Sequence, residues 1–178
     1  MIVRRNGQDR GVVDASMKLT SIEQVVRALN EAQVPFIVVG GMAVVAHGYG
    51  RQTVDLDVVV RLDAQAICNA FRALAELGYQ PRVPVTAAEF AIPAQRARWI
   101  AENGMTVLSF QSDRHRETPI DVFVTEPFDF EGEYRAALVE ELAPGVPLRI
   151  ARLETLLRLK QQAGRPQDLA DIAELRLL

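Results

Sequence analysis

The sequence predicts a domain of the α/β (α+β) class, in which a small mixed β-sheet carries helices mainly on one side. Short apolar runs rich in β-branched residues interleave with segments whose apolar residues recur every three or four positions. They do so without the regular parallel βαβ succession of a doubly wound fold. The 178 residues, 49% of them hydrophobic, are enough to bury one core. We therefore expect a single domain over residues 17–178, preceded by a flexible extension over residues 1–16.

The first predicted elements alternate between helix and strand. Thr20 and Ser21 are capping-type residues before an apolar stripe, which predicts a helix from there to about Gln33. The run FIVV predicts a buried strand that ends at Gly40, and MAVVAHG predicts a short helix directly after it. The run VDLDVVV predicts a second strand over about residues 54–61.

The middle of the chain predicts two helical regions and a hairpin. Asp63 caps a helix that stops at Gly78, and a second amphipathic segment over residues 86–102 is broken or kinked at Pro93. The runs MTVLSFQS and PIDVFVT are strand-like and are separated by the polar loop DRHRE, so we expect them to pair as an antiparallel hairpin.

The last third predicts a helix, a short strand and a helical pair. Helical patterning covers residues 130–142, and VPLRIA follows as a short strand. RLETLLRLKQQAG and PQDLADIAELRLL form a C-terminal helical pair divided by Gly164 and Pro166.

Composition narrows the functional classes. The net charge of −3 and pI of about 5.5 give no global basic field for binding nucleic acid, although a local patch is compatible with them. One cysteine and two histidines exclude an internal disulfide and a thiolate zinc cluster. The first residues, MIVRRNGQDRGVVD, have no long apolar core, so we expect neither a signal peptide nor a membrane anchor, and a cytoplasmic location.

Two aspartates interrupt the second predicted strand. Residues two apart in a strand face the same way, so Asp55 and Asp57 project together, and the core-facing set is Val54, Leu56 and Val58. Two carboxylates roughly 5 Å apart repel by about 3 kcal/mol at an effective dielectric constant near 20. A divalent cation compensates for such repulsion, and Mg²⁺ prefers carboxylate oxygens.

A third aspartate sits in a similar context. Asp121 interrupts the apolar run PIDVFV, with Ile120 and Val122 on the opposite face. The alternative for Asp55 and Asp57 is the solvent face of a half-exposed strand.

Paired glycines precede these acids. Gly40 and Gly41 fall at a strand-to-helix junction, where a backbone without side chains can approach phosphate and a helix N-terminus favours anions. The alternative for the glycines is an ordinary tight turn.

The pattern resembles the signature of the nucleotidyltransferase superfamily, that of DNA polymerase beta. That signature is an apolar residue, Gly, Gly or Ser, a spacer, and then Asp, apolar, Asp or Glu, apolar. The matching residues are Val39, Gly40, Gly41, Asp55, Leu56, Asp57 and Val58. The spacer is at the long end of the family range.

The resemblance implies a fold, a reaction and a metal site. It implies the nucleotidyltransferase fold and two Mg²⁺ ions held by Asp55 and Asp57, with Asp121 as the third carboxylate and a candidate general base. It implies transfer of a nucleoside monophosphate from a nucleoside triphosphate, such as ATP, to a hydroxyl group, with loss of pyrophosphate.

The C-terminal segment KQQAGRPQDLADI resembles one found in bacterial abortive-infection toxin nucleotidyltransferases. The matching residues are Lys160, Arg165, Asp168 and Asp171. Lys160 is a candidate for neutralising nucleotide phosphate, and Asp168 for orienting it or for satisfying backbone donors. The alternative for all four is helix capping and surface ion pairing.

Three further positions are candidates for ligand contact. Arg51 and Thr53 precede the acids and are candidate nucleotide-binding residues, with simple loop solvation as the alternative. The RHR loop over residues 114–116 is a basic cluster that either contacts RNA or is solvated.

Two classes of function follow from the sequence. The first is a Mg²⁺-dependent nucleotidyltransferase acting on RNA such as tRNA, on protein or on a small molecule, including the toxin of a toxin–antitoxin pair with an antitoxin protein as partner. The second is a non-catalytic nucleotide-binding or protein-interaction module that retains the fold.

Overall fold

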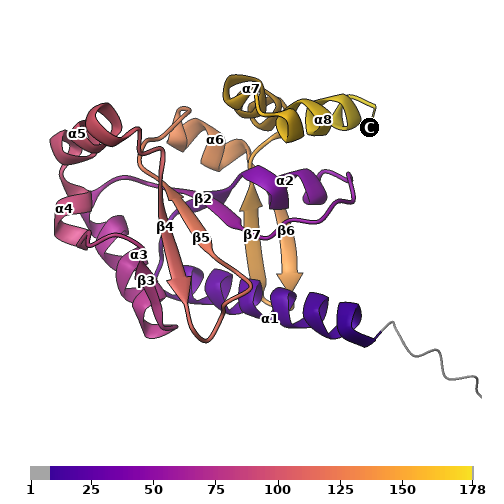
Figure 1. Cartoon of the computed structure of the whole chain (residues 1–178), viewed down its shortest axis with the longest axis horizontal. Helices are drawn as coiled ribbons and strands as arrows, with labels where there is room; N and C mark the ends of the chain where they lie inside the picture. The colour runs from indigo at the N-terminus through magenta and orange to yellow at the C-terminus, as the bar shows by residue number, and fades with distance from the viewer. Residues whose placement is uncertain (1–8, 178) are drawn as a thin grey trace, which may run out of the picture.

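The computed structural model describes residues 9–177, with side chains described from residue 20 onward (Figure 1). These residues form eight helices: α1 (Asp9–Glu31), α2 (Gly40–Ala46), α3 (Ala64–Glu76), α4 (Ala87–Ala91), α5 (Pro93–Asn103), α6 (Phe130–Ala136), α7 (Leu153–Ala163) and α8 (Pro166–Leu175). None of the helices within residues 9–177 is both long enough and apolar enough to cross a lipid bilayer.

Seven strands form one mixed sheet in the order β3-β4-β5-β2-β1-β7-β6. Their bounds are β1 (Phe36–Val38), β2 (Leu56–Val60), β3 (Tyr79–Pro81), β4 (Val107–Ser112), β5 (Ile120–Phe123), β6 (Leu138–Ala143) and β7 (Val146–Ile150). β2 runs parallel to β5 and β1 parallel to β7, whereas the remaining neighbours are antiparallel. The mixed sheet confirms the predicted fold class.

Alternate residues of the central strands pack into two apolar clusters. The larger cluster takes Leu56, Val58 and Val60 from β2 together with side chains of α1, α3 and α4. The smaller cluster takes Val59 of β2 together with Phe130 of α6 and Leu159 of α7. Since successive strand residues face opposite ways, the two clusters mark the two faces of the sheet.

Most predicted elements are present, with shifted ends. Asp63 accepts a hydrogen bond from the Ala66 backbone and caps α3 as expected. The break at Pro93 separates α4 from α5, because proline is tolerated in the first turn of a helix and not within it. The hairpin of β4 and β5 is antiparallel, as predicted. Gly164 adopts a left-handed conformation and separates the C-terminal helices.

Three elements differ from expectation. α1 begins at Asp9, so Thr20 and Ser21 lie inside it and do not cap it, because nothing before them interrupts the helix. The second half of the helix predicted over residues 130–142 is strand β6, which pairs with β7 through a turn at Gly145. β3 is an edge strand of three residues, too short to give an alternating pattern.

The predicted boundary at residues 16 and 17 stays a prediction. Residues 9–16 are helical as part of α1, and residues 1–8 lie outside the described residues.

Candidate active site

Two aspartates from distant parts of the chain stand side by side on the sheet. β2 and β5 pair in parallel with Asp57 opposite Asp121. Asp55 directly precedes β2, two residues before Asp57. All three acids therefore lie on neighbouring segments at one end of the parallel pair.

The aspartates share the sheet face of the smaller apolar cluster. Leu56 and Val58 on either side of Asp57, and Ile120 and Val122 on either side of Asp121, are buried in the larger cluster. Alternation directs both carboxylates to the opposite face. Val54, predicted to face the core, is 54% exposed, because β2 begins only at Leu56.

Burial and neighbouring negative charges raise the pKa values of Asp55 and Asp57. Burial, followed by the charges of Asp121 and Asp55, raises the pKa of Asp57 from 3.8 to about 6. Burial and the charge of Asp121 also raise the pKa of Asp55, and the charge of Arg82 opposes that shift. A hydrogen bond from the Gly41 backbone and the charge of Lys160 lower the pKa of Asp57 without cancelling the rise. Negative charge is thus concentrated at this point of the sheet, where a cation is favoured.

The glycine pair packs directly against Asp57. Gly40 has a φ of +61°, and a Cβ placed on it would lie 1.9 Å from Oδ2 of Asp57. It stands between β1 and α2, as the sequence predicts. The backbone and the carboxylate approach so closely that only glycine fits.

Arg51 and Thr53 gather at the second glycine. A Cβ on Gly41 would lie 2.2 Å from Oγ1 of Thr53 and 3.0 Å from Nη2 of Arg51. The predicted nucleotide-binding residues Gly40, Gly41, Arg51 and Thr53 are therefore neighbours in space.

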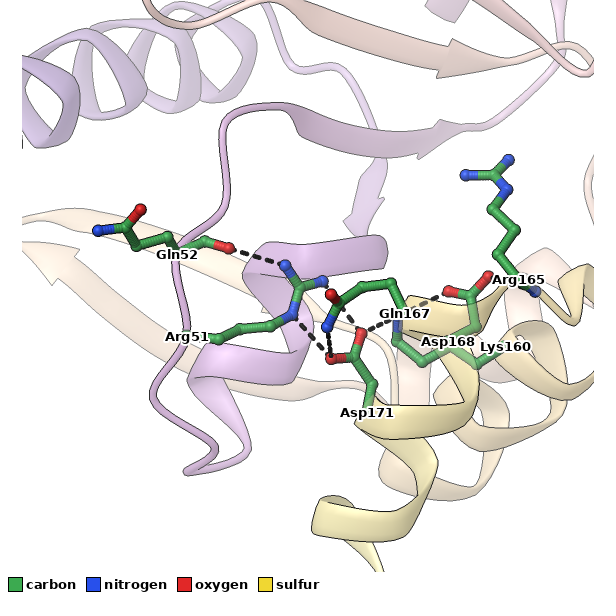
Figure 2. A network of polar contacts seen from close by, with 7 residues as sticks. All are labelled: Arg51, Gln52, Lys160, Arg165, Gln167, Asp168 and Asp171. Carbon is green, nitrogen blue, oxygen red and sulfur yellow. Dashed lines mark hydrogen bonds and ion pairs between the residues drawn. The ribbon is translucent and has the colours of Figure 1, made fainter.

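A buried ion-pair network joins Arg51 to the C-terminal helices (Figure 2). Asp171 of α8 is fully buried and lies 2.9 Å from Nε of Arg51 and 2.6 Å from Nζ of Lys160. Asp168 accepts a second hydrogen bond from Lys160, at 3.1 Å, and one from the Arg165 backbone. Asp168 thus satisfies a backbone donor, as expected. The ion pairs of Lys160 with Asp168 and Asp171 are largely buried, whereas the alternative interpretation placed them on the surface.

Two residues of this face have no signal in the sequence. Ser109 of β4 pairs with Asp121, and the Arg82 backbone donates to the Ser109 carbonyl at 2.9 Å. A row of Arg82, Ser109, Asp121 and Asp57 therefore crosses four neighbouring segments of the chain. Only the strand register could have revealed it.

The donor set suits Mg²⁺, although it is not a ready-made cage. In the part of the chain whose side chains are described, no three His, Cys, Asp or Glu residues are grouped so that they could hold a metal ion. Mg²⁺ in nucleotide sites is usually bound by one or two carboxylates together with substrate phosphates. The in-register pair of Asp57 and Asp121 supplies two such carboxylates, and the negative charges of Asp121 and Asp55 beside Asp57 favour a cation there.

Comparison with known proteins identifies the fold. No family model matches the chain, and no curated protein matches it in sequence. Among solved structures it is similar to an antigenic nucleotidyltransferase-like protein from Paracoccidioides brasiliensis, with a TM-score of 0.53 and 18% sequence identity. The superposition covers 90% of this chain and 75% of that one. The fold is nucleotidyltransferase-like. At this identity the likeness extends to the fold alone.

Proposed function

We propose that this protein is a metal-dependent nucleotidyltransferase that transfers a nucleoside monophosphate from a nucleoside triphosphate to a hydroxyl group. The observation that carries the proposal is the in-register pairing of Asp57 with Asp121 beside Gly40. The nucleotidyltransferase-like fold supports the same class of reaction. A bacterial toxin role, with tRNA or protein as acceptor and an antitoxin as partner, rests on the C-terminal resemblance alone.

The chemistry assigned to the residues is a single displacement. The acceptor oxygen attacks the α-phosphorus, forming a P–O bond, while the bond from that phosphorus to the bridging oxygen breaks and pyrophosphate leaves. Asp121 accepts the hydroxyl proton as general base. Asp57 and Asp121, with Asp55 beside them, would hold Mg²⁺ together with triphosphate oxygens, and the ion would supply charge neutralisation for the triphosphate and for the entering and leaving oxygens.

The remaining candidates act on the nucleotide. Gly40 and Gly41 form the turn assigned to the phosphates, and Arg51 and Thr53 pack against Gly41 at that turn. Lys160 lies within electrostatic reach of Asp57, and Asp168 fixes its position.

The alternative function is a non-catalytic module that retains the fold. The observation favouring it is that Arg51 and Lys160 are already paired with the carboxylates of Asp171 and Asp168, so neither is a free cation for phosphate. Nucleotide binding with Mg²⁺ but without transfer would favour this alternative.

The test combines transfer with binding. The protein is incubated with Mg²⁺, each α-labelled nucleoside triphosphate and cell extract. We expect a labelled product whose formation falls by more than about 100-fold in Asp121→Asn, the lower end of the effect of a general base, and comparably in Asp57→Asn. The raised pKa of Asp57 means that its negative charge destabilises the folded protein. Asp57→Asn removes that charge, so we expect the variant to stay folded.

Glu140→Gln is the matched control, because Glu140 is an exposed carboxylate of strand β6 at the far edge of the same sheet. Mg²⁺ together with a triphosphate should also raise the melting temperature of the wild type and of Glu140→Gln, with a smaller rise in Asp57→Asn. Equal labelling by wild type and Asp57→Asn would refute the proposal, as would no labelling with any triphosphate.

A further inference from the structure

A groove lies beside the aspartates at the β3–β4 edge of the sheet. Its volume is about 350 Å³. β3, the end of β4 and the loop that follows β4 supply most of its lining, which includes Gln80, Arg82, Gln111, Arg114, His115 and Arg116. None of the residues assigned to the reaction lines it.

The groove and the aspartates share one face of the sheet. Gln80 pairs with Gln111, and both alternate with the buried Tyr79 and Phe110 of the larger apolar cluster. They therefore face the same side as Asp121, whose partner Ser109 is two residues before Gln111 on β4. The charge of Arg82, at the groove, acts on Asp55. The groove thus lies on the same face of the sheet as the proposed reacting centre, one strand away from Asp121.

Positive charge is concentrated in the groove. Arg82, Arg114 and Arg116 are exposed there, and the one acid among the lining residues is Asp113. Asp113 lies 3.4 Å from Arg116, in a pair whose side chains are 95% and 75% exposed. Within residues 20–177, no carboxylate lies within ion-pair distance of Arg82 or Arg114. The guanidinium donors of these two residues are available to an anionic ligand.

The loop that carries two of the arginines is held in place. Nδ1 of His115 lies 2.9 Å from Oγ of Ser21 on α1, and its ring stacks on Tyr79. The Tyr79 hydroxyl donates to the Thr118 carbonyl at 2.8 Å, and the Arg114 backbone donates to Oγ of Ser112. A groove fixed in this way needs little ordering when a ligand binds.

We propose that this groove binds the phosphodiester backbone of a single-stranded nucleic acid, which is the acceptor of the transferred nucleotide. Guanidinium groups bind phosphate with paired donors. The side-chain amides of Gln80 and Gln111 supply both donors and acceptors, as base edges require. A strand in the groove directs its terminal hydroxyl toward Asp121. The role of the strand as acceptor rests on the proposed function, whereas its binding in the groove does not.

The test measures binding without catalysis. Fluorescence anisotropy is recorded with labelled single-stranded RNA and DNA oligonucleotides of one sequence, without nucleotide, over a range of salt concentrations. We expect the double variant Arg82→Gln, Arg114→Gln to bind at least about tenfold more weakly than wild type. Its slope of log affinity against log salt should be shallower by about 1.4, since each phosphate contact on a single strand contributes about 0.7.

Arg98→Gln on α5 is the matched control, because Arg98 is an exposed arginine whose ion pair is with Glu102 on its own helix. Binding of RNA and DNA alike supports recognition of the backbone, and preference for RNA supports added recognition of the 2′-hydroxyl. Equal affinity of the wild type and the double variant overturns the proposal. Displacement of the oligonucleotide by a poly-glutamate peptide of equal charge at equal concentration also overturns it, in favour of a protein acceptor.

The two proposals fail separately. If Asp57→Asn binds the oligonucleotide but the wild type transfers no nucleotide, the groove proposal stands and the proposed enzymatic function is refuted. If the double variant transfers nucleotide as well as the wild type does, the proposed enzymatic function stands and the groove is not the acceptor site.

Discussion

At the residue scale, Gly40 determines whether Asp57 can occupy its position. A Cβ on Gly40 would lie 1.9 Å from Oδ2 and 2.5 Å from Cγ of Asp57, at a φ of +61°. We expect Gly40→Ala to be destabilised by about 1–2 kcal/mol, because alanine is strained in the left-handed conformation. Displacement of the Asp57 carboxylate by the new Cβ should cost about 1–3 kcal/mol more. Urea denaturation measures the sum of the two costs. The transfer assay shows whether the displaced Asp57 carboxylate still functions.

A second glycine separates these two contributions. Gly104 has a φ of +62°, and a Cβ placed on it would have no neighbouring atom within 4 Å, so Gly104→Ala carries the conformational cost alone. The prediction requires that Gly40→Ala be the more destabilised variant and that only it lose transfer. Equal losses of stability with full transfer in both would show that the contact with Asp57 does not matter.

At the scale of elements, one buried carboxylate joins α6 to the start of α7. Glu133 is 3% exposed and accepts hydrogen bonds from the Arg152 backbone at 2.7 Å and from Oγ1 of Thr155 at 2.7 Å. Burial acts to raise the pKa of Glu133, but the hydrogen bonds from Arg152 and Thr155 prevail and lower it below 4.5. The N-cap residue of α7, Arg152, makes no side-chain cap hydrogen bond, and Glu133 accepts from the start of the helix in its place.

The lowered pKa fixes the sign of a pH effect. The unfolded chain binds the proton more readily, so the stabilisation by Glu133 is present above about pH 4.5 and is lost as the pH falls through the lower folded pKa. We expect Glu133→Gln to cost about 2–4 kcal/mol at pH 7 and to flatten the acid side of the stability curve. Glu131→Gln on the same helix, where the side chain is 55% exposed, should change stability by less than about 0.5 kcal/mol. Denaturant titrations from pH 3 to 7 would contradict the assignment if both variants followed one curve.

Elements were predictable where local pattern decides them. The caps and stops at Asp63, Pro93 and Gly164 act within one turn of the chain, and the structure has all three. The helix predicted over β6 was wrong because the strand state of β6 depends on pairing with β7 across Gly145, and residues 130–142 alone fit a helical period. The cap predicted at Thr20 was wrong because a capping-type residue is also compatible with a helix interior.

At the scale of the whole molecule, the sheet order assembles the candidate site. Helices α3, α4 and α5 and strands β3 and β4 lie between Asp57 and Asp121 in the chain, and only the parallel register of β2 and β5 sets the two acids opposite each other. The residue types and the alternation that gives them a common face could be read from the sequence. The register could not, and for the same reason Arg82 and Ser109 were not recognised on that face.

The last helix is tied to the turn that precedes the acids. Asp171 of α8 is fully buried, accepts from Nη2 of Arg51 at 3.0 Å and from Nζ of Lys160 at 2.6 Å, and so links the chain end to the loop that packs on Gly41 (Figure 2). Removing one member of a buried charge group leaves the others without their partner, at a cost of roughly 3–5 kcal/mol. We expect Asp171→Asn to lose stability of this order.

A local measurement distinguishes a tie between α8 and this loop from a general loss of stability. Hydrogen exchange in Asp171→Asn should quicken in the peptide over residues 49–55 more than in β4, since within residues 20–177 no ion pair or side-chain hydrogen bond of Arg51, Lys160 or Asp171 involves β4. Glu174→Gln, on an exposed face of the same helix, should leave both peptides unchanged. Exchange that quickened equally in β4 and in residues 49–55 would mean that Asp171 stabilises the domain as a whole without holding Arg51 against the glycine turn.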